Sequence, residues 1–263
     1  MSERRPGVPS WVARSVQNPA PASRAVPARS ALATAAARAP QQPSGIGMDS
    51  AAVRARMVQR LAATGIQSPA VLAAMGAVER HRFVDSALVN QAYEDTSLPI
   101  GLAQTISKPS VVARMVELLM RAESARGGSL GRVLEIGTGC GYQAAVLARL
   151  AREVYTVERL RALHEKARDN LRPLRLANVH LLLGDGMVGY AKGAPYAAII
   201  SAAGGDSVPQ QWCDQLAPGG RLVAPTVGAN GQQVLLVIDR TPHGLQQSVL
   251  EAVNFVPLKS GIV

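Results

Sequence analysis

Short apolar runs alternate with helix-favouring segments throughout the second half of the chain. Five runs rich in branched apolar residues occupy residues 133–136, 154–157, 179–183, 196–201 and 221–225. Helical patterns at 142–150, 160–171 and 208–216 separate most of them, and this alternation is typical of parallel strands buried on both faces. Two further runs, at 233–239 and 246–255, have no helix between them and are expected to pair as an antiparallel hairpin. The pattern therefore predicts an α/β fold with a doubly wound, mostly parallel, seven-stranded Rossmann-like sheet.

A helical and loop-rich region precedes the first predicted strand. Val53, Met57 and Leu61 recur on one helical face, and Ser68-Pro69 is typical of the start of a second helix. A polar, irregular passage at 91–101 leads toward a third helix, predicted at about 111–121. We therefore expect one domain over residues 48–263, with a helical extension at 48–121 and the sheet at 122–263.

Residues 1–47 differ in composition from the rest. They contain seven of the 17 prolines, and their six arginines and one acid, Glu3, give them +5 of the net charge of +10. The prolines oppose the amphipathic helix of a transit peptide, and no apolar stretch of the kind found in export signals follows Arg4-Arg5. We expect a disordered tail rich in Pro, Ala and Arg. The remaining +5 is only weak support for a nucleic-acid partner.

A glycine-rich turn follows the first strand. Gly137, Gly139 and Gly141 come directly before a run of strong helix formers, and strand, glycine turn and helix together let a backbone approach a ligand closely. A tight turn without a ligand gives the same pattern. Glu158 ends the next strand about 20 residues later, where nucleotide-binding α/β units place a carboxylate that holds two ribose hydroxyls.

The glycine spacing bears on the choice of ligand. Dinucleotide folds use G-x-G-x-x-G to bind a pyrophosphate, whereas here G-x-G-x-G follows an acid, Glu135. A cationic ligand with an adenosine end, such as S-adenosylmethionine, fits this arrangement better. Asp185-Gly186 ends a neighbouring strand on the same expected edge, although this dipeptide is also a common turn signal.

Composition narrows the alternatives. Aromatic residues make up only 3% of the chain, which leaves little for a base-stacking surface. No apolar run approaches the roughly 20 residues of a membrane span, and the four histidines have no metal-ligand spacing. The two cysteines, Cys140 and Cys213, make a disulfide framework implausible and favour a reducing compartment, so we expect a cytoplasmic protein without metal or membrane partner.

Several passages outside residues 1–47 resemble those of the protein-L-isoaspartate O-methyltransferase family. They are Ala92-Tyr93-Glu94-Asp95, Leu98-Pro99-Ile100-Gly101, Gln104-Thr105-Ile106-Ser107-x-Pro109, residues 133–143, Gly184-Asp185-Gly186, residues 215–223 and Phe255-Val256-Pro257-Leu258. The resemblance implies methyl transfer from S-adenosylmethionine to the α-carboxylate of L-isoaspartyl residues in damaged proteins and peptides. The ester then closes to a succinimide that can open to normal aspartate.

The resemblance also implies roles for single residues. The residues around the methionine part of the cofactor would be Glu135, Gly137, Thr138, Gly139 and Gly141. Glu158 would bind the ribose, and Asp185 and Gly186 would lie beside the adenine. Ser107 matches the active-site serine of the family. The chain departs from the usual family pattern at Lys108, at Ala197 and in the small residues of 201–205, which affects the shape of the substrate groove.

The chemistry needs positioning more than a base. A carboxylate is already an anionic nucleophile, so catalysis is expected from alignment and electrostatics. Ser107 and Thr105 carry hydroxyls suited to orient it, although Ser107 before Lys108-Pro109 also has the pattern of a helix N-cap. We expect a monomer without a nucleic-acid partner.

Two other functions fit the sequence less well. A nucleic-acid enzyme that methylates a base amino group usually has an Asn/Asp-Pro-Pro-aromatic segment where this chain has Ser201-Ala202-Ala203-Gly204. A cytosine C5 methyltransferase needs a cysteine nucleophile in the same region, and none lies there. A binding module without turnover is opposed by the presence of Glu158, Asp185 and Ser107.

Overall fold

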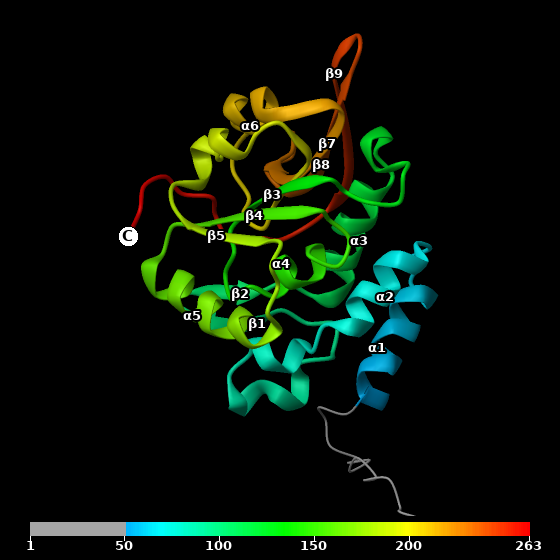
Figure 1. Cartoon of the computed structure of the whole chain (residues 1–263), viewed down its shortest axis with the longest axis vertical. Helices are drawn as coiled ribbons and strands as arrows, with labels where there is room; N and C mark the ends of the chain where they lie inside the picture. The colour runs from blue at the N-terminus through cyan, green and yellow to red at the C-terminus, as the bar shows by residue number, and fades with distance from the viewer. Residues whose placement is uncertain (1–50) are drawn as a thin grey trace, which may run out of the picture. The chain divides into compact units, whose positions relative to one another are not determined.

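A seven-stranded sheet forms the centre of the part of the chain that the computed structural model describes, residues 51–263 (Figure 1). Its strands lie in the order β5-β4-β3-β6-β7-β8-β9; β3 to β7 are parallel to one another, β8 is antiparallel to β7, and β9 is antiparallel to β8. They are β3 (Arg132–Ile136), β4 (Glu153–Glu158), β5 (Val179–Leu183), β6 (Tyr196–Ser201), β7 (Leu216–Val227), β8 (Gln233–Thr241) and β9 (Gly244–Ala252). The predicted mostly parallel sheet with a terminal hairpin is confirmed. The predicted tail at 1–47 lies outside the described residues.

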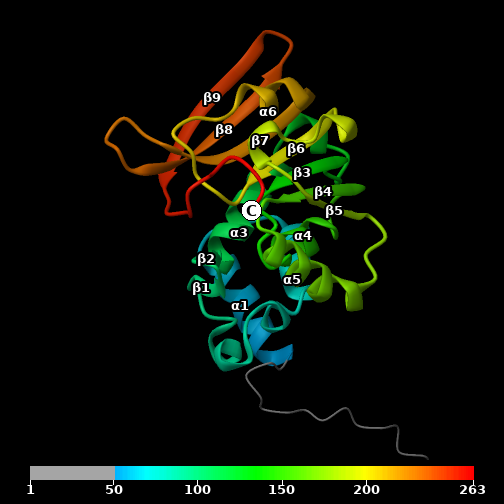
Figure 2. The ribbon, with the colours of Figure 1, turned by 90° about the vertical axis from the view of Figure 1, so that its left-hand side faces the viewer.

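Alternate strand residues pack on opposite faces of this sheet. Val133 belongs to the core on the face of α3 (Pro109–Met120), α4 (Tyr142–Leu147) and α5 (Arg161–Leu171). Its neighbour Leu134 packs with Trp212 of α6 (Gln210–Gln215) on the other face. Figure 2 shows α6 and α4/α5 on opposite sides of the sheet. This period of two is what the continuous apolar runs require of a sheet covered on both faces.

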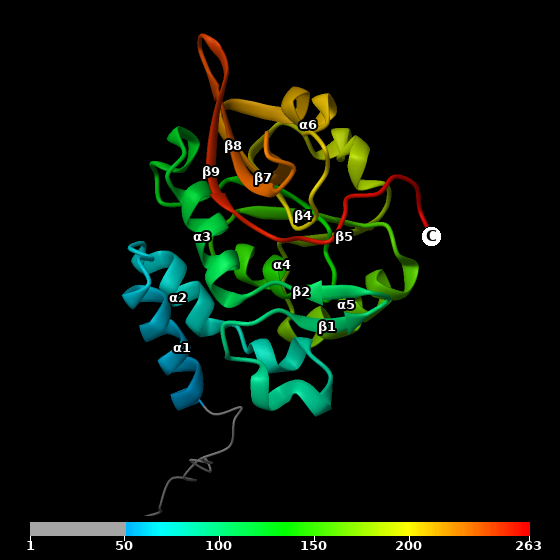
Figure 3. The same cartoon turned by 180° about the vertical axis from the view of Figure 1, so that it is seen from behind.

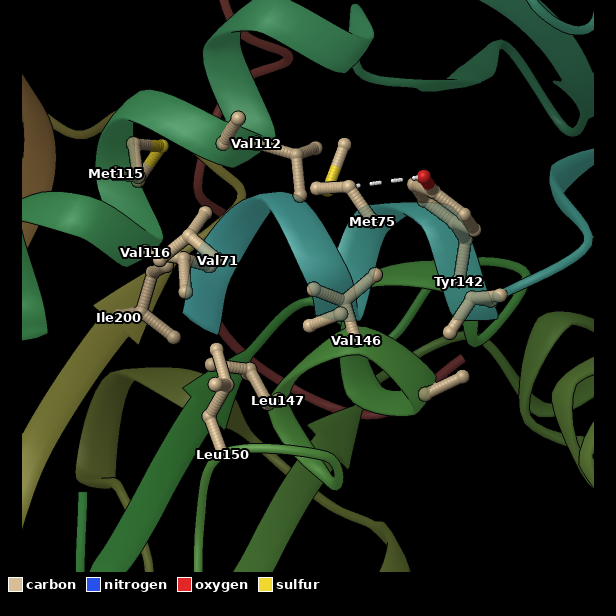
Figure 4. Packing of buried hydrophobic residues seen from close by; sticks show 14 of the residues in the cluster. Val71, Met75, Val112, Met115, Val116, Tyr142, Val146, Leu147, Leu150 and Ile200 are labelled. Carbon is tan, nitrogen blue, oxygen red and sulfur yellow. Dashed lines mark hydrogen bonds between the residues drawn. The ribbon is translucent and has the colours of Figure 1, made fainter. Parts of the chain in front are cut away.

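The helices before the sheet share its core. α1 (Ala51–Ala63) and α2 (Pro69–Ala77) precede α3, and Ser68 caps α2 by accepting a hydrogen bond from the Val71 N–H at 3.4 Å. Figure 4 shows α2 residues Val71 and Met75 between side chains of α3 and α4. The helical extension therefore packs on the sheet instead of forming a core of its own. No helix between residues 51 and 263 is long and apolar enough to cross a bilayer.

Some predicted boundaries moved. α3 begins at Pro109, two residues early, because proline is well suited to the first helical position. α4 ends at Leu147 instead of residue 150, since the next three residues form turns with i→i+3 hydrogen bonds such as Leu150 N–H to Leu147 C=O, 2.9 Å. β7 begins at Leu216, directly after α6, instead of at residue 221.

A β-hairpin occupies the end of the passage predicted to be irregular. β1 (Leu98–Gly101) and β2 (Gln104–Ile106) pair antiparallel through a two-residue turn. Leu102 and Ala103 in that turn have φ of +53° and +55°, in the left-handed region that side chains with a Cβ disfavour. Hairpin turns of this kind normally carry Asn or Gly, so this one has no sequence signal. Leu102 is 57% exposed.

The strain in this turn can be measured by Ala103→Gly. Glycine avoids the cost of about 1–2 kcal/mol that a Cβ carries in the left-handed region, and it loses about 0.5–1 kcal/mol more chain entropy on folding. We expect the variant to be more stable by up to about 1 kcal/mol, measured by thermal melting. The control is Ala55→Gly on the exposed face of α1, in the interior of the helix, which should lose about 1 kcal/mol. A destabilised Ala103→Gly variant would show that the turn is not strained.

Candidate active site

A cavity of about 710 Å³ lies at the carboxyl ends of β3, β4 and β6, within the range of small-molecule sites. Its walls come from the glycine loop after β3, the start of α5, the β1–β2 hairpin and residues 256–259 after β9. The predicted site residues that line it are Thr105, Ser107, Gly137, Thr138, Gly139, Glu158 and Gly186. Glu135, Gly141 and Asp185 lie outside the lining and act on it through neighbours.

The glycine loop requires its glycines. Gly137, Gly139 and Gly141 have φ of +87°, +57° and +91°, all in the left-handed region. A Cβ on Gly141 would stand 3.0 Å from the Leu171 side chain of α5. The loop is thus a tight strand-to-helix turn, and it also presents its backbone to the cavity.

Glu158 holds this loop in place. Its Oε2 accepts a hydrogen bond from the Gly139 N–H at 2.8 Å, and its Oε1 accepts from the Arg159 and Leu160 N–H groups at 2.9 Å each. A carboxylate offers about four acceptor positions, so three are already used by the backbone. The sequence places the carboxylate at the cavity as predicted, but it misses this second, structural role. An incoming pair of ribose hydroxyls would share acceptor positions with these N–H groups.

Glu135 lies one layer beneath the loop. It is fully buried. Its Oε2 accepts a hydrogen bond from the Thr156 hydroxyl at 2.6 Å. The Thr156 hydroxyl also lies 2.6 Å from the Thr138 hydroxyl, within hydrogen-bond distance. Since Thr138 lines the cavity, these hydroxyls connect the cavity to the buried carboxyl group. Burial raises the pKa of Glu135 from 4.5 to about 8, with a smaller contribution from the negative charge of Glu158.

Two buried polar atoms here have no hydrogen-bond partner among the described residues, Glu135 Oε1 and Gln143 Nε2. Gln143 lines the cavity. The Gln143 side chain lowers the pKa of Glu135 against the effect of burial, so this donor and this acceptor lie near each other without forming a hydrogen bond. A ligand or water that bonds to both would relieve the cost of leaving them without partners. An acid beneath the loop also favours a ligand with positive charge, and S-adenosylmethionine carries both a cationic group and hydroxyls. The residues present therefore fit this cofactor.

Asp185 behaves as a turn residue that also anchors a distant segment. Its Oδ1 accepts from the Met187 N–H at 2.8 Å, and its Oδ2 accepts from the Gly261 N–H at 2.7 Å. Gly186 lines the cavity instead, and a Cβ there would stand 2.6 Å from Ile136 Cγ2. The turn interpretation is seen directly, whereas contact between Asp185 and an adenine stays a prediction.

The segment after β9 closes one side of the cavity. The Gly204 N–H donates to the Val256 carbonyl and the Leu258 N–H donates to the Gly204 carbonyl, each at 2.8 Å. Farther on, Val263 pairs through its backbone with Arg159 and Arg161. Figure 3 shows this segment running from β9 across the end of the sheet. Strand and helix periods do not detect such a segment; only its Phe255-Val256-Pro257-Leu258 motif marked it.

The hydroxyl of Ser107 does not cap α3. The N-cap residue is Lys108, and the side chain of Asp95 performs the capping, accepting from the Ser110 N–H at 2.8 Å and from the Ser110 hydroxyl at 2.7 Å. The Ser107 hydroxyl has no hydrogen bond among the residues described. The N-cap interpretation of Ser107 is therefore wrong, and its hydroxyl remains available at the cavity wall. Asp95 was missed because it lies 15 residues from its partner.

The described part of the chain has no cluster of side chains typical of a metal site. Between residues 51 and 263 no group of three or more His, Cys, Asp or Glu side chains is arranged to hold a metal ion. Cys140 and Cys213 are both buried free thiols, and burial raises the pKa of Cys140 to about 11, so this thiol is a poor nucleophile.

The doubly wound sheet, the glycine loop with its following acid and the adjoining cavity define an S-adenosylmethionine-dependent methyltransferase of the Rossmann-like class. A family model described as Protein-L-isoaspartate(D-aspartate) O-methyltransferase (PCMT) matches residues 52–262. The chain belongs to this family, and the predicted resemblance is confirmed.

Relatives of the same name are highly similar to the chain. The protein-L-isoaspartate O-methyltransferase of Methylibium petroleiphilum is 63% identical over 221 residues, covering 83% of this chain and 81% of that protein. The enzyme of Leptothrix cholodnii is 60% identical over 220 residues, covering 83% and 77%.

Solved structures agree. A protein-L-isoaspartate O-methyltransferase structure matches with a TM-score of 0.70 and 29% identity, over 80% of this chain and 67% of that chain. A putative family member from Plasmodium falciparum, in complex with S-adenosyl-L-homocysteine, has a TM-score of 0.68 and 24% identity over 78% and 98% of the two chains, a likeness of fold.

Removing the Glu158 carboxylate should weaken cofactor binding. Hydrogen bonds to a charged group contribute about 1.5–3 kcal/mol, and Glu158→Ala also frees the loop, so we expect S-adenosylmethionine to bind about 10- to 100-fold more weakly by calorimetry. Glu158→Gln, which keeps an acceptor oxygen, should lose less. Unchanged affinity in a folded Glu158→Ala variant would place the ribose elsewhere.

The raised pKa of Glu135 predicts proton release on cofactor binding. At pH 7 the carboxyl group is mostly protonated, and a nearby cation favours its ionised form, so affinity should increase as the pH rises toward about 8. Without ligand, the free energy of unfolding should decrease as the pH rises from about 4.5 to about 8. Over this range the unfolded chain has lost the Glu135 proton, whereas the folded chain still holds it. Calorimetry in buffers of different ionisation enthalpy measures the proton. Glu135→Gln should bind without releasing it, and equal release in both proteins would exclude Glu135.

Proposed function

We propose that this protein transfers a methyl group from S-adenosylmethionine to the α-carboxylate of L-isoaspartyl residues in damaged proteins and peptides, which starts their return to aspartate through a succinimide. One observation carries this proposal most directly. A single cavity brings the glycine loop and Glu158 together with the hydroxyl-bearing residues Ser107 and Thr105, in a chain of the protein-L-isoaspartate O-methyltransferase family.

The cofactor would lie along the strand ends. We assign the methionine part to Gly137, Thr138 and Gly139, with Glu135 and Gly141 supporting them from below, the ribose to Glu158, and the adenine to the neighbourhood of Asp185 and Gly186. When bound by these residues, S-adenosylmethionine would supply the methyl group of its sulfonium to a carboxylate oxygen and would leave as S-adenosylhomocysteine. The protein needs no general base for this displacement, because the nucleophile is already ionised.

Ser107 and Thr105 are assigned to the substrate carboxylate. Ser107 is half-buried at the cavity wall, and Thr105 on β2 is exposed. A hydroxyl donor can orient one carboxylate oxygen while leaving the other free to react, and the cavity walls restrict water. Lys108 beside them is exposed and could attract acidic peptides, although a solvated lysine explains it equally well.

We further infer a cytoplasmic monomer that acts on isoaspartyl proteins without nucleic acid or membrane. The two buried free thiols support a reducing compartment. The scarcity of aromatic residues gives little support to base stacking.

The substrate assignment is tested with labelled S-adenosylmethionine and two peptides that differ only in aspartate versus isoaspartate. We expect label in the isoaspartyl peptide alone, with base-labile ester chemistry. Equal labelling of both peptides, or labelling of a nucleic acid in their place, would overturn the proposal.

Ser107→Ala should reduce the rate of methyl transfer by roughly 10- to 1000-fold, the range for loss of one oriented donor from a preorganised site. Because Asp95 supplies the cap of α3, the melting temperature should barely change. Affinity for S-adenosylmethionine, measured by calorimetry, should also be nearly unchanged.

Ser107→Gly is the matched control, since it also lacks the hydroxyl and should be equally slow. Were either variant to turn over isoaspartyl peptide at the wild-type rate, Ser107 would have no catalytic role.

A further inference from the structure

The fully buried guanidinium of Arg80 has no acidic partner in the described part of the chain. Arg80 begins the 3₁₀ turn η1 (Arg80–Phe83), its side chain is 0% exposed, and it forms no ion pair with any residue from 51 to 263. Its Nη1 has no hydrogen-bond partner among those residues. A buried charge without a carboxylate is expensive, and burial lowers the pKa of Arg80. Such a group calls for a reason beyond packing.

One side of Arg80 holds the loop that leads to the substrate wall. Its Nε donates to the Ala92 carbonyl at 2.8 Å, and its Nη2 donates to the Thr96 carbonyl at 3.4 Å. Between these two carbonyls lies Asp95, whose carboxylate caps α3 through Ser110. Thr96 is also two residues from the start of β1, so this loop supports both the hairpin that carries Thr105 and the segment that carries Ser107.

The other side of Arg80 rests on the cofactor wall. Its guanidinium carbon lies 4.9 Å from the ring centre of Tyr142, in cation–π geometry. Tyr142 is the first residue of α4, follows Gly141 directly and lines the cavity. Its hydroxyl points toward Met75 of α2, with an O–S distance of 3.8 Å (Figure 4). Its ring is thereby fixed between α2 and Arg80.

Arg80 therefore lies between the two walls that must meet in methyl transfer. We propose that Arg80 is a positioning residue for the reaction, which fixes the spacing between the glycine loop and the Ser107 hydroxyl without touching either substrate. This inference rests on the proposed function and adds a residue outside the cavity lining. Displacements of about 1 Å in such a pairing can cost on the order of 100-fold in rate.

The substitution Arg80→Lys tests it. Lysine keeps the charge but lacks the planar fork that reaches two carbonyls while stacking on a ring. At saturating S-adenosylmethionine and isoaspartyl peptide, well below the melting temperature, we expect the single-turnover rate to fall at least about 10-fold. Affinity for S-adenosylmethionine should stay within about 2-fold, because the glycine loop and Glu158 are unchanged.

The matched control is Arg221→Lys. Arg221 is also largely buried and donates to a backbone carbonyl, that of Leu118 at 2.9 Å, but at the opposite end of α3. It should lower the melting temperature and keep the wild-type rate. Asp95→Ala, an exposed change on the same loop, should slow the reaction with cofactor affinity retained. If Arg80→Lys does not fold, Arg80→Gln, which removes the buried charge but keeps an amide donor, is measured in its place with the same expected loss of rate.

The double variant adds a further criterion. If Arg80 acts through the Asp95 loop, Arg80→Lys with Asp95→Ala should be no slower than the slower single variant, since coupled positions are not additive. A folded Arg80→Lys protein with the wild-type rate would reduce Arg80 to a structural residue. Parallel loss of rate and cofactor affinity would likewise overturn the inference. Failure of the wild-type protein to label isoaspartyl peptide would instead refute the proposed function.

Discussion

The absence of side chains at Gly137, Gly139 and Gly141 is the constraint on which the rest of the site depends. A Cβ on Gly137 would stand 3.5 Å from the Ala202 side chain after β6, and one on Gly139 would stand 3.2 Å from Ile100 of the β1–β2 hairpin. On the third glycine, Gly141, it would meet α5. Two of these neighbours, Ala202 and Ile100, line the cavity, so two of its walls meet the loop at its glycines. The loop is held there by the carboxylate of Glu158, so the same group that is assigned to the cofactor also keeps the loop in its left-handed conformation.

Charge is arranged in the site by depth. Glu158 accepts three backbone N–H groups, which stabilise a negative charge at the cavity edge. Glu135, a layer deeper, has one hydroxyl donor and an oxygen without a partner, and burial favours its neutral form. A cation bound above Glu135 would favour its ionised form, which is a reason for an acid to be tolerated beneath the loop.

The sequence predicted what depends on local period and missed what depends on contacts between distant residues. Apolar runs and their spacing were enough to predict the parallel strands, the terminal hairpin and the place of Glu158. The β1–β2 hairpin escaped because its turn consists of Leu102 and Ala103, which carry no turn signal. The cap of α3 was assigned to Ser107 as an alternative because capping rules consider neighbours in sequence, whereas Asp95 reaches Ser110 through a fold of the loop. A cap supplied by a residue distant in sequence leaves no periodic pattern that sequence rules could detect.

The segment that follows β9 has a consequence for how the protein is made. Residues 256–259 line the same cavity as the glycine loop more than a hundred positions earlier, and Val263 pairs with Arg159 and Arg161. During translation, the sheet strands and Glu158 emerge well before this segment, so a nascent chain can assemble the framework while one wall is still inside the ribosome. A chain that stopped before this segment would keep the strands of the sheet but would lack one wall of the cavity.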